Sequence, residues 1–520
     1  MKQSRLLVVM FMLALYILLV SSAAFADSED RMSGAYSYRI KGNGTVAITG
    51  FDWKNNNADI YIPNMLDGYT VSEIGEEAFA RNVYKDNDDK DSVVVTLPNT
   101  ITTIGEKAFF NTAITSIIIP ESVEAIGGGA FANCRNITRF SVASGNRTYS
   151  VIDGVLYNKK TKTLIAYPLT KSLTAIPEGI VAIGDYAFYS KDFLSGGIAK
   201  HFPASIKEVG KWAFAETKMN LYKDGFLPAN VETIDDYAFY NCKVNSQKDW
   251  TAAIDVPATL TSIGNHAFEG MELPGYGIYG DYPTLKFYGK DLSIGDYAFY
   301  NASLEVGFGS MEGKFTAGEY AFSNISASCV WFDEIKQNCK LEELTEGIFK
   351  NTHVANDLID DGDDYIYGLE IAGRYKLIPK EAFRLGGYAE KSKDVLQIDI
   401  RKGIKEIGEY AFADRPALKK VMLPFTLTII GDGAFANCLS LESITIPEKV
   451  EEIGENAFSN CPSLSGVYIP ASTESIGENA FDRDTITLTV ESGSYAERWA
   501  RDNGYAYGYP ESDDLSWLNN

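Results

Sequence analysis

Histidine is scarce in this chain, and its scarcity removes several kinds of catalytic site. Only three of the 520 residues are histidine. Because His201, His266 and His353 lie far apart in the sequence, a histidine-based triad or a zinc site is not expected. Phosphate-binding loops and dinucleotide fingerprints are also missing, since the many glycines belong to a repeat described below. We therefore predict no catalytic residues, no metal site and no cofactor.

Carboxylates are abundant, but the sequence singles out none of them as a catalytic or metal-binding group. Two carboxylates would suffice for glycoside hydrolysis, yet no particular pair is favoured. The acidic loops at 86–91 and 357–364 lack the Asp-x-Asp-x-Asp-Gly spacing of a calcium-binding loop. We interpret both loops as solvated surface, and we expect a protein that is not an enzyme.

Long hydrophobic runs are also few. One apolar run, Leu6 to Val20, follows Lys2 and Arg5 and precedes the small-x-small pattern of Ala24 to Ala26. This order predicts a secretory signal peptide over residues 1–26. The alternative is an uncleaved membrane anchor, which the shortness of the run disfavours. We expect a secreted, extracellular protein with no transmembrane segment after cleavage, free in the medium or held non-covalently at a cell surface.

Basic residues are outnumbered, with 47 lysines and arginines against 70 acidic residues and a net charge of −23. Such a charge favours solubility and repels nucleic acid and anionic membrane surfaces. It favours basic partners or cations in their place, although a solvated acidic surface explains the same composition. We therefore expect no nucleic-acid partner.

What the chain has in abundance is one phrase, Ile-Gly-x-x-Ala-Phe, which is complete at Ile407 to Phe412. The last three steps between copies are each 23 residues long, and a fixed period of this length is typical of a solenoid. Counting imperfect copies, the phrase ends at Phe79, Phe109, Phe131, Phe188, Phe214, Phe239, Phe268, Phe299, Phe322, Phe349, Phe383, Phe412, Phe435, Phe458 and Phe481.

One full repeat, from Leu441 to Cys461, predicts the course of a single turn of the solenoid. Residues 441–446 have strand character, and Pro447 ends the strand because proline cannot donate a hydrogen bond to a sheet. A second short strand over 450–453 is closed by a tight turn at Gly454. The phenylalanine follows on a turn too short for a helix. Each turn should add one rung to a parallel sheet, with rungs about 4.8 Å apart and the phenylalanines stacked as a spine.

Six cysteines are present, and the repeat assigns four of them to one structural position. Cys134, Cys242, Cys438 and Cys461 each lie three residues after the signature phenylalanine, at a position that other copies fill with asparagine or threonine. We expect these four to be free, buried thiols. Cys329 and Cys339 lie outside the pattern, and whether they form a disulfide is left open.

The spacing of the repeats also predicts the domain organisation. After the signal peptide we expect an N-terminal β cap at 27–73 and a solenoid of about 15 repeats at 74–490. The solenoid should contain an inserted β-hairpin near 140–167 and an irregular stretch at 269–395. A C-terminal cap and acidic tail should occupy 491–520, with a helix between Ser494 and Asn503. We expect the chain to be a monomer.

An aromatic stripe is the one feature of the repeat that suggests a ligand surface. The residue two before the signature phenylalanine is aromatic or histidine in six successive copies. Rings with a polar tip are favoured at binding surfaces, and open ring faces suit sugars or extended peptides. The alternative is that these rings pack against each other and shield the turn. The stripe consists of Tyr186, Trp212, Tyr237, His266, Tyr297 and Tyr320.

The phrase Ile-Gly-x-x-Ala-Phe-x-x-Cys, together with the preceding Leu-x-x-Ile-x-Ile-Pro strand, resembles the BspA-like, or treponemal-type, branch of leucine-rich-repeat surface proteins. The segments 145–158 and 493–497 are also similar to that family, and the resemblance covers nearly all of residues 27–505. The copies that end at Phe349 and Phe383 depart from the pattern and leave the repeat count uncertain. The resemblance implies a strand-dominated α/β solenoid, wound as a right-handed superhelix with short turns and 3-10 segments. It also implies export.

The resemblance further implies a role in protein binding, such as attachment to a host matrix or a neighbouring cell surface. We therefore expect an adhesion or protein-binding scaffold that is not catalytic. The alternative is a glycan-binding protein of the envelope or extracellular space that uses the aromatic stripe.

Overall fold

The computed structural model describes most of the chain after residue 28, and the predicted signal peptide lies outside the described residues. The described residues are 29–53, 59–80, 93–193, 198–220, 225–245, 254–273, 284–289, 291–311, 314–325, 330–331, 340–341, 344–350, 352, 354–355, 357–360, 365–371, 375–385 and 395–510. The chain divides into two compact units. Unit 1 comprises Met1–Ser195 with His201–Lys218, and unit 2 comprises Gly196–Lys200 with Met219–Asn520.

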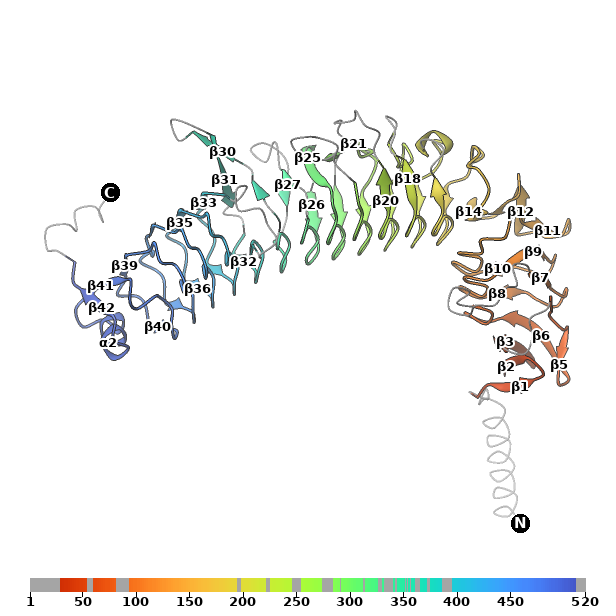
Figure 1. The fold of residues 1–520 in the computed structure, drawn as a ribbon, viewed down its shortest axis with the longest axis horizontal. Coiled ribbons are helices and arrows are strands. Elements are labelled where there is room, and N and C mark those ends of the chain that lie inside the picture. Colours follow the sequence, from red (N-terminus) through yellow and green to blue (C-terminus); the bar gives the residue numbers. More distant parts are fainter. Residues whose placement is uncertain are drawn as a thin grey trace, which may run out of the picture. The chain divides into compact units, whose positions relative to one another are not determined.

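Unit 1 begins with antiparallel strands and continues as parallel rungs (Figure 1). Strands β1 to β3 pair antiparallel, and β3, β6, β8 and β10 then pair parallel in sequence. A second sheet of parallel strands has the order β11-β9-β7-β4. The strands are β1 (Arg31–Ser33), β2 (Tyr36–Ile40), β3 (Thr45–Phe51), β4 (Ile60–Tyr61), β5 (Met65–Leu66), β6 (Tyr69–Ile74), β7 (Val93–Thr96), β8 (Thr103–Ile104), β9 (Ile114–Ile119), β10 (Ala125–Ile126) and β11 (Ser141–Val142).

The longest interval between signature phenylalanines in unit 1 contains an antiparallel meander. Strand β12 pairs with β13 and β13 with β14, both antiparallel, after which β14, β15 and β17 resume the parallel order. The strands are β12 (Tyr149–Ile152), β13 (Val155–Asn158), β14 (Thr163–Ala166), β15 (Ala182–Ile183), β16 (Asp192–Phe193) and β17 (Glu208–Val209). The 3-10 helix η1 (Ala199–His201) and β18 (Lys218–Asn220) follow.

Unit 2 consists of successive turns whose strands lie side by side in Figure 1. Part of a larger sheet runs in the order β19-β22-β24-β26-β28, and a separate sheet has the order β21-β23-β25-β27-β29, while β20 belongs to neither of these two runs. The strands of this part of the chain are β19 (Thr233–Ile234), β20 (Lys243–Asn245), β21 (Ile254–Asp255), β22 (Ser262–Ile263), β23 (Thr284–Gly289), β24 (Leu292–Ile294), β25 (Glu305–Met311), β26 (Lys314–Ala317), β27 (Val330–Trp331), β28 (Lys340–Leu341) and β29 (Val354–Ala355).

The later turns of unit 2 build two further parallel ladders, β31-β33-β35-β37 and β32-β34-β36-β38-β40. Strand β30 pairs antiparallel with β31, and β39, β41 and β42 form the last sheet. The strands are β30 (Asp357–Asp360), β31 (Tyr365–Ile371), β32 (Leu377–Ile378), β33 (Gln397–Ile400), β34 (Glu406–Ile407), β35 (Lys420–Met422), β36 (Ile429–Ile430), β37 (Ser443–Ile444), β38 (Glu452–Ile453), β39 (Gly466–Ile469), β40 (Ser475–Ile476), β41 (Thr487–Val490) and β42 (Ala506–Gly508).

The predicted strand-dominated solenoid is therefore confirmed, with two refinements. Each turn adds a rung to two parallel ladders and not to one, as β37 and β38 of a single repeat show. The first strand is also shorter than the predicted 441–446. The backbone N–H of Leu441 still donates to the carbonyl of Cys438 at 3.1 Å, so the chain is turning there and enters the ladder only at Ser443.

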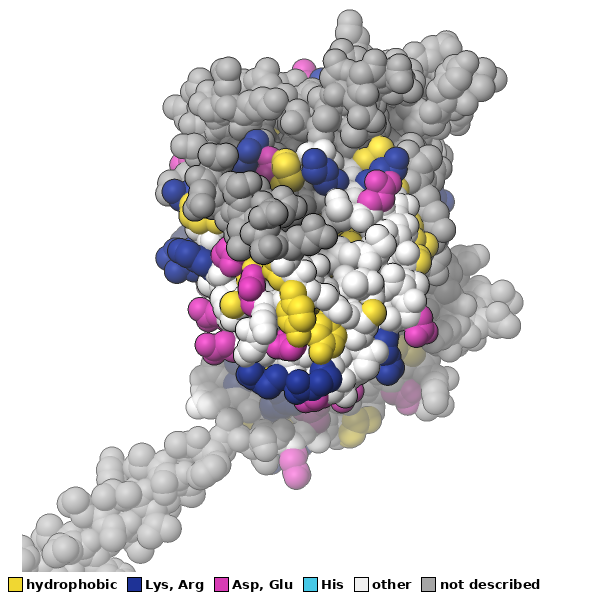
Figure 2. All heavy atoms as spheres, turned by 90° about the vertical axis from the view of Figure 1, so that its left-hand side faces the viewer, with side chains coloured by type: hydrophobic (Ala, Val, Ile, Leu, Met, Phe, Trp, Pro, Cys, Tyr) yellow, Lys and Arg dark blue, Asp and Glu magenta, His cyan; other side chains and the backbone are white. Residues whose placement is uncertain are grey.

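Helices are rare in the part of the chain that the structure describes, where they are confined to η1 and α2 (Tyr495–Asp502). Ser494 begins α2 by accepting the backbone N–H of Glu497 at 3.1 Å, and Asn503 follows its last residue. Ala496, Trp499 and Ala500 form its buried face, which packs against β41 and β42. Figure 2 views this end of unit 2 and shows a few hydrophobic side chains surrounded by charged ones. No helix among the described residues is long and apolar enough to cross a membrane.

The signature phenylalanines form the expected spine. The rings of Phe412, Phe435, Phe458 and Phe481 stack at centroid distances of 5.3 Å with interplanar angles of 5–12°, and all four are buried. Their backbones form a ladder of their own, because the N–H of Phe435 donates to the carbonyl of Ala457 on the next rung at 2.8 Å. In these turns of unit 2 the hydrophobic core therefore contains one stacked ring per rung.

The position three residues after the phenylalanine is an internal polar slot. Cys134, Cys242, Cys438 and Cys461 lie in it as free, buried thiols, as predicted. The Cys461 thiol donates to the carbonyl of Phe435 on the preceding rung at 3.3 Å. Cys329 and Cys339 lie outside the described residues.

The slot also accepts a lysine, which the sequence did not lead us to expect. Lys191 is 2% exposed, and its Nζ donates to the carbonyls of Pro168, Leu169 and Lys171 at 3.3, 2.7 and 2.7 Å. Burial lowers the pKa of Lys191 to about 8. The ammonium thus binds the connection that leads out of the β12–β14 meander.

Candidate functional site

All six residues of the predicted aromatic stripe have the same backbone conformation. Their φ angles lie between 53° and 57°, in the left-handed region that residues other than glycine and asparagine rarely adopt. We call this place in the repeat the column position. The backbone N–H of Tyr237 donates to the carbonyl of Asn265 on the next rung at 2.9 Å, and that of Tyr297 to the carbonyl of Glu319 at 2.9 Å. These inter-rung hydrogen bonds offset the strain.

Sequence analysis missed this conformation, although a signal for it was present. Other copies place Gly129, Gly433, Asn456 and Asn479 at the column position, and all four also have positive φ. Glycine and asparagine are the residues that favour the left-handed region. Their alternation with tyrosine at one place in the repeat could therefore have predicted it.

The structure brings the stripe together within each unit. In unit 2, Tyr237 stacks on His266 at 4.6 Å, His266 on Tyr297 at 5.1 Å, and Tyr297 on Tyr320 at 5.1 Å, with interplanar angles of 5°, 5° and 14°. In unit 1, the rings of Tyr186 and Trp212 stack at 5.9 Å with an angle of 8°.

Stacking decides which part of each ring a ligand can reach. His266 and Tyr297 each have a neighbouring ring on both faces. All six residues of the stripe are half-buried, and because the ring faces of His266 and Tyr297 are covered, the exposed part of these two side chains lies at their edges. The ring faces are thus used for packing of one ring against the next, as the alternative interpretation of the stripe expected. The ring edges remain available for contact with a ligand.

A second aromatic row, which the sequence analysis did not single out, runs beside the stripe in unit 2. Tyr240 and Tyr300 directly follow a signature phenylalanine. Their rings pack edge-on against Tyr237 and Tyr297 at 5.7 and 5.4 Å. Both are half-buried. We call the combined surface the tyrosine patch; it comprises Tyr237, Tyr240, His266, Tyr297, Tyr300 and Tyr320.

Burial and neighbouring carboxylates raise the pKa of two phenols of the tyrosine patch, those of Tyr297 and Tyr320. Burial raises the pKa of Tyr297, and the negative charge of Glu319 adds to the effect. Burial also raises the pKa of Tyr320, whose hydroxyl donates to Oε1 of Glu346 at 3.0 Å. Tyr297 and Tyr320 therefore place neutral hydroxyl groups beside the negative charges of Glu319 and Glu346. His266 pairs through Nδ1 with Glu269.

Beyond Tyr320 a charged cluster replaces the aromatic column. Glu381 holds the column position there and is 7% exposed. Its carboxylate accepts from Lys350 Nζ at 2.6 Å and from Arg384 Nη1 at 2.6 Å. Arg384 also pairs with Asp414 at 2.7 Å and lies over the ring of Tyr410. The cluster thus links three rungs by charge, whereas stacked rings link the rungs from Tyr237 to Tyr320.

The other residues that could form a metal or catalytic site find little support in the part of the chain that the structure describes. No group of three or more potential metal ligands occurs among the described residues. His201 and His266 lie in different units, and His353, the loop at 86–91 and residues 361–364 lie outside the described residues.

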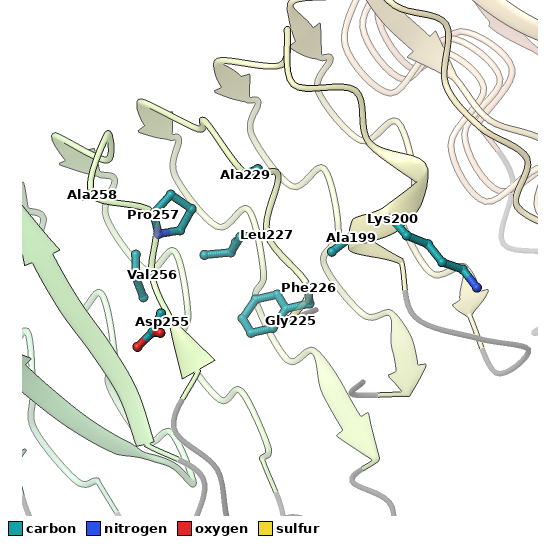
Figure 3. A pocket seen from close by; sticks show the side chains of 10 residues that line it. All are labelled: Ala199, Lys200, Gly225, Phe226, Leu227, Ala229, Asp255, Val256, Pro257 and Ala258. Carbon is teal, nitrogen blue, oxygen red and sulfur yellow. The ribbon is translucent and has the colours of Figure 1, made fainter. Parts of the chain in front are cut away.

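A hollow of about 500 Å³ in unit 2 has an apolar lining and two charged residues at its rim, Lys200 and Asp255. Figure 3 shows that the side chain of Lys200 points away from the apolar lining. Polar groups that converge on a ligand are the mark of a small-molecule site, and the described side chains that line this hollow do not provide them. Its lining comprises Ala199, Lys200, Gly225, Phe226, Leu227, Ala229, Asp255, Val256, Pro257 and Ala258.

Comparison with known proteins supports the repeat directly. The sequence model of a family described as the BspA type leucine rich repeat region (6 copies) matches residues 49–174, 166–281, 251–367 and 377–493. No protein with a curated description matches the chain.

Among solved structures, a leucine-rich repeat protein from Bacteroides ovatus is 20% identical, covering 93% of this chain and 100% of that chain with a TM-score of 0.47. A leucine rich cell surface protein from Faecalibacterium prausnitzii is 19% identical, covering 91% and 97%, with a TM-score of 0.36. The pneumococcal vaccine antigen PcpA is 12% identical, covering 93% and 99%, with a TM-score of 0.28. The matches to the family model span most of the length of this chain, and the chain therefore belongs to the BspA-type leucine-rich-repeat family.

Proposed function

We propose that this protein is an exported, non-catalytic scaffold that binds other proteins outside the cell or at its surface. Membership of a family of repeat scaffolds supports the general role, and the signal-peptide pattern at 1–26 supports export. A parallel solenoid holds its surface side chains on a rigid backbone, which lowers the conformational entropy lost on binding.

The observation that carries the proposal is the exposure of the tyrosine patch by its edges. Tyrosine supplies a large, rigid contact area with a polar tip and is enriched at the centres of protein interfaces. The alternative, a glycan-binding protein, would use the flat face of a ring against a sugar. Because both faces of His266 and Tyr297 are covered by neighbouring rings, the patch suits a protein surface better than a sugar ring.

A binding panel tests the proposal. The chain without its predicted signal peptide, residues 27–520, is measured against extracellular-matrix proteins and against polysaccharides at low and physiological salt. The matched variants are Tyr237→Asn with Tyr297→Asn, and Tyr410→Asn as the control. Asparagine is chosen because Asn456 and Asn479 occupy the column position with the same backbone.

We expect saturable binding to at least one protein, which the double variant weakens and Tyr410→Asn does not. Binding confined to polysaccharides and lost in the double variant would replace the proposal with the glycan alternative. Absence of binding on both panels would contradict both functions.

A further inference from the structure

The hollow in unit 2 lies where one parallel ladder is interrupted. Strand β21 stands first in the order β21-β23-β25-β27-β29, and among the described strands it pairs with β23 alone. The preceding turn supplies Phe226 and Leu227 to the lining of the hollow, and the turn that contains β21 supplies Asp255 and Val256 (Figure 3). The first edge of this ladder is therefore open toward the hollow.

The backbone of β21 directs hydrogen-bonding groups toward the hollow. Asp255 is the register partner of Lys286 in β23, and the backbone N–H of Val256 donates to the carbonyl of Lys286 at 2.8 Å. In a parallel pair, neighbouring residues of one strand point their N–H and carbonyl groups toward opposite edges. Because Val256 bonds to β23, the N–H and the carbonyl of Asp255 point away from β23 and toward the preceding turn.

The preceding turn leaves a backbone donor open on its side of the hollow. Leu227 holds the place of Val256 there, since each of the two residues directly precedes a proline of its turn. The ladder would pair the N–H of Leu227 with the carbonyl of Asp255, but no hydrogen bond joins these two groups. Leu227 is 7% exposed, and no carbonyl of the described backbone accepts its N–H. Unpaired buried N–H groups are rare in native proteins, so this position favours a ligand that brings a carbonyl acceptor.

The side chains around the hollow are mostly apolar. Phe226, Leu227 and Val256 are buried, while Ala229 and Ala258 are exposed. The volume of about 500 Å³ leaves room for a bulky side chain. A peptide that adds to a sheet as a strand takes its affinity from main-chain hydrogen bonds and its specificity from pockets for alternate side chains. An open strand edge beside an apolar hollow provides both.

The strand on the other edge of β21 shows which side-chain pattern this ladder accepts. In β23, Leu285 and Phe287 are buried, with Lys286 half-buried between them. Lys286 is in register with Asp255, which is exposed at the rim of the hollow. Residues of opposite charge in register stabilise a ladder. A basic residue flanked by apolar ones therefore complements the open edge as well.

We propose that the open edge of β21 and the hollow beside it bind an extended segment of a partner protein as an added strand. The segment places a bulky apolar side chain in the hollow and a basic side chain next to Asp255. Its backbone pairs with the groups of Asp255 and Leu227 that face the hollow. This surface shares no residue with the tyrosine patch, so the inference goes beyond the proposed function and is tested separately from it.

The probe is a synthetic peptide, Ser-Thr-Leu-Lys-Phe-Thr-Ser, which contains residues 284–287 of β23. A second version carries N-methyl groups on its leucine, lysine and phenylalanine, which keeps every side chain and removes the backbone donors. A third version has serine in place of leucine and phenylalanine, which removes the apolar side chains. Binding to the chain without its predicted signal peptide is measured by calorimetry.

Two variants of the protein block the site in different ways. Asp255→Pro removes the N–H that faces the hollow and spares the bond from Val256 to β23. Ala229→Trp fills the hollow from its rim. Ala471→Trp is the matched control for the second variant, because Ala229 and Ala471 are both exposed and each directly follows a proline. Melting temperatures identify any variant that fails to fold.

We expect the first peptide to bind the parent, and Asp255→Pro and Ala229→Trp each to weaken binding about tenfold, because each removes a main-chain hydrogen bond or an apolar contact. Ala471→Trp, and Tyr237→Asn with Tyr297→Asn, should bind the peptide like the parent. The N-methylated and serine versions should not bind. Absence of binding to the parent, or equal binding of the first and the N-methylated peptides, would overturn the inference.

A second copy of the chain is the other candidate for the open edge. Light scattering at the concentrations of the binding measurement should show a monomer. A dimer that Asp255→Pro abolishes would assign the edge to self-association and overturn the inference.

Discussion

The rings of Phe435 and Phe458 lie parallel, with their centroids 5.3 Å apart and their planes 5° from each other. Each ring fills the space above the ring of the preceding turn, so removal of one leaves a cavity that both neighbours line. The relationship recurs from rung to rung, and the stability of one turn therefore depends on the turns beside it.

Replacement of Phe435 by alanine should lower the free energy of unfolding by about 3–5 kcal/mol, because the ring is fully buried and the cavity cannot collapse. Phe425→Ala is the matched control, since that side chain is 57% exposed and should cost little. Urea denaturation followed by circular dichroism measures both. Equal costs for the two variants would show that the spine is not what holds the turns together.

Replacement of Gly454 by alanine should also destabilise unit 2, for a different reason. A Cβ atom at this position would lie 2.5 Å from the backbone nitrogen of Asp432 on the preceding rung. Overpacking of this kind costs about 1–3 kcal/mol and sometimes more. At Gly466 in β39 the nearest atom would lie 3.7 Å from such a Cβ, so Gly466→Ala serves as the control. A melting temperature that Gly454→Ala leaves unchanged would contradict the close approach of the rungs.

The four slot thiols should be inert in the folded protein. Burial raises the pKa of the Cys134 thiol to about 11 and that of Cys461 to about 12, so almost no thiolate forms at neutral pH. In a Cys329→Ser, Cys339→Ser background, we expect no maleimide labelling at pH 7 until denaturant is added, when all four thiols react. Mass spectrometry of labelled peptides identifies each site. Labelling of Cys134 or Cys461 before unfolding would contradict their burial.

Acid should weaken the charged cluster at Glu381. Burial alone would raise the pKa of this carboxyl, but hydrogen bonds and charge from Lys350 and Arg384 lower it below the ordinary value of 4.5. A carboxyl whose pKa is lowered by folding contributes stability that is fully present above its unfolded pKa. That contribution is lost as the pH falls through the folded pKa.

Glu381→Gln should therefore be less stable than the parent by about 1–2 kcal/mol at neutral pH. The difference should shrink as the pH falls below about 4.5, the ordinary carboxyl value. Denaturant titrations of both proteins across this range measure the difference, with Glu452→Gln as an exposed control. A difference that does not change with pH would exclude the carboxylate charge as its cause.

The repeat period determined most of what could be predicted. It located the spine, the slot of Cys438 and Cys461, and the parallel stacking, because each of these is set by the spacing of apolar and small residues along one turn. It did not reveal that each turn contributes to two ladders, since strands as short as Glu452–Ile453 carry too few residues for a pattern of alternation.

The candidate site was predicted only as a row of residue types. The stripe from Tyr186 to Tyr320 was visible in the sequence, but whether the rings would expose faces or edges depends on the left-handed backbone of the column position. Relations between turns of different length could not be obtained from the sequence alone.

The left-handed column position has a consequence for how such a protein can change. Tyrosine, tryptophan, histidine, lysine, glutamate, asparagine and glycine all stand there with nearly the same φ, because hydrogen bonds to the next rung fix the backbone whatever the side chain is. The packed spine lies two residues away and is not disturbed by the exchange. Mutation can therefore alter the chemistry of an entire row of the surface, one turn at a time, while the architecture beneath it stays constant.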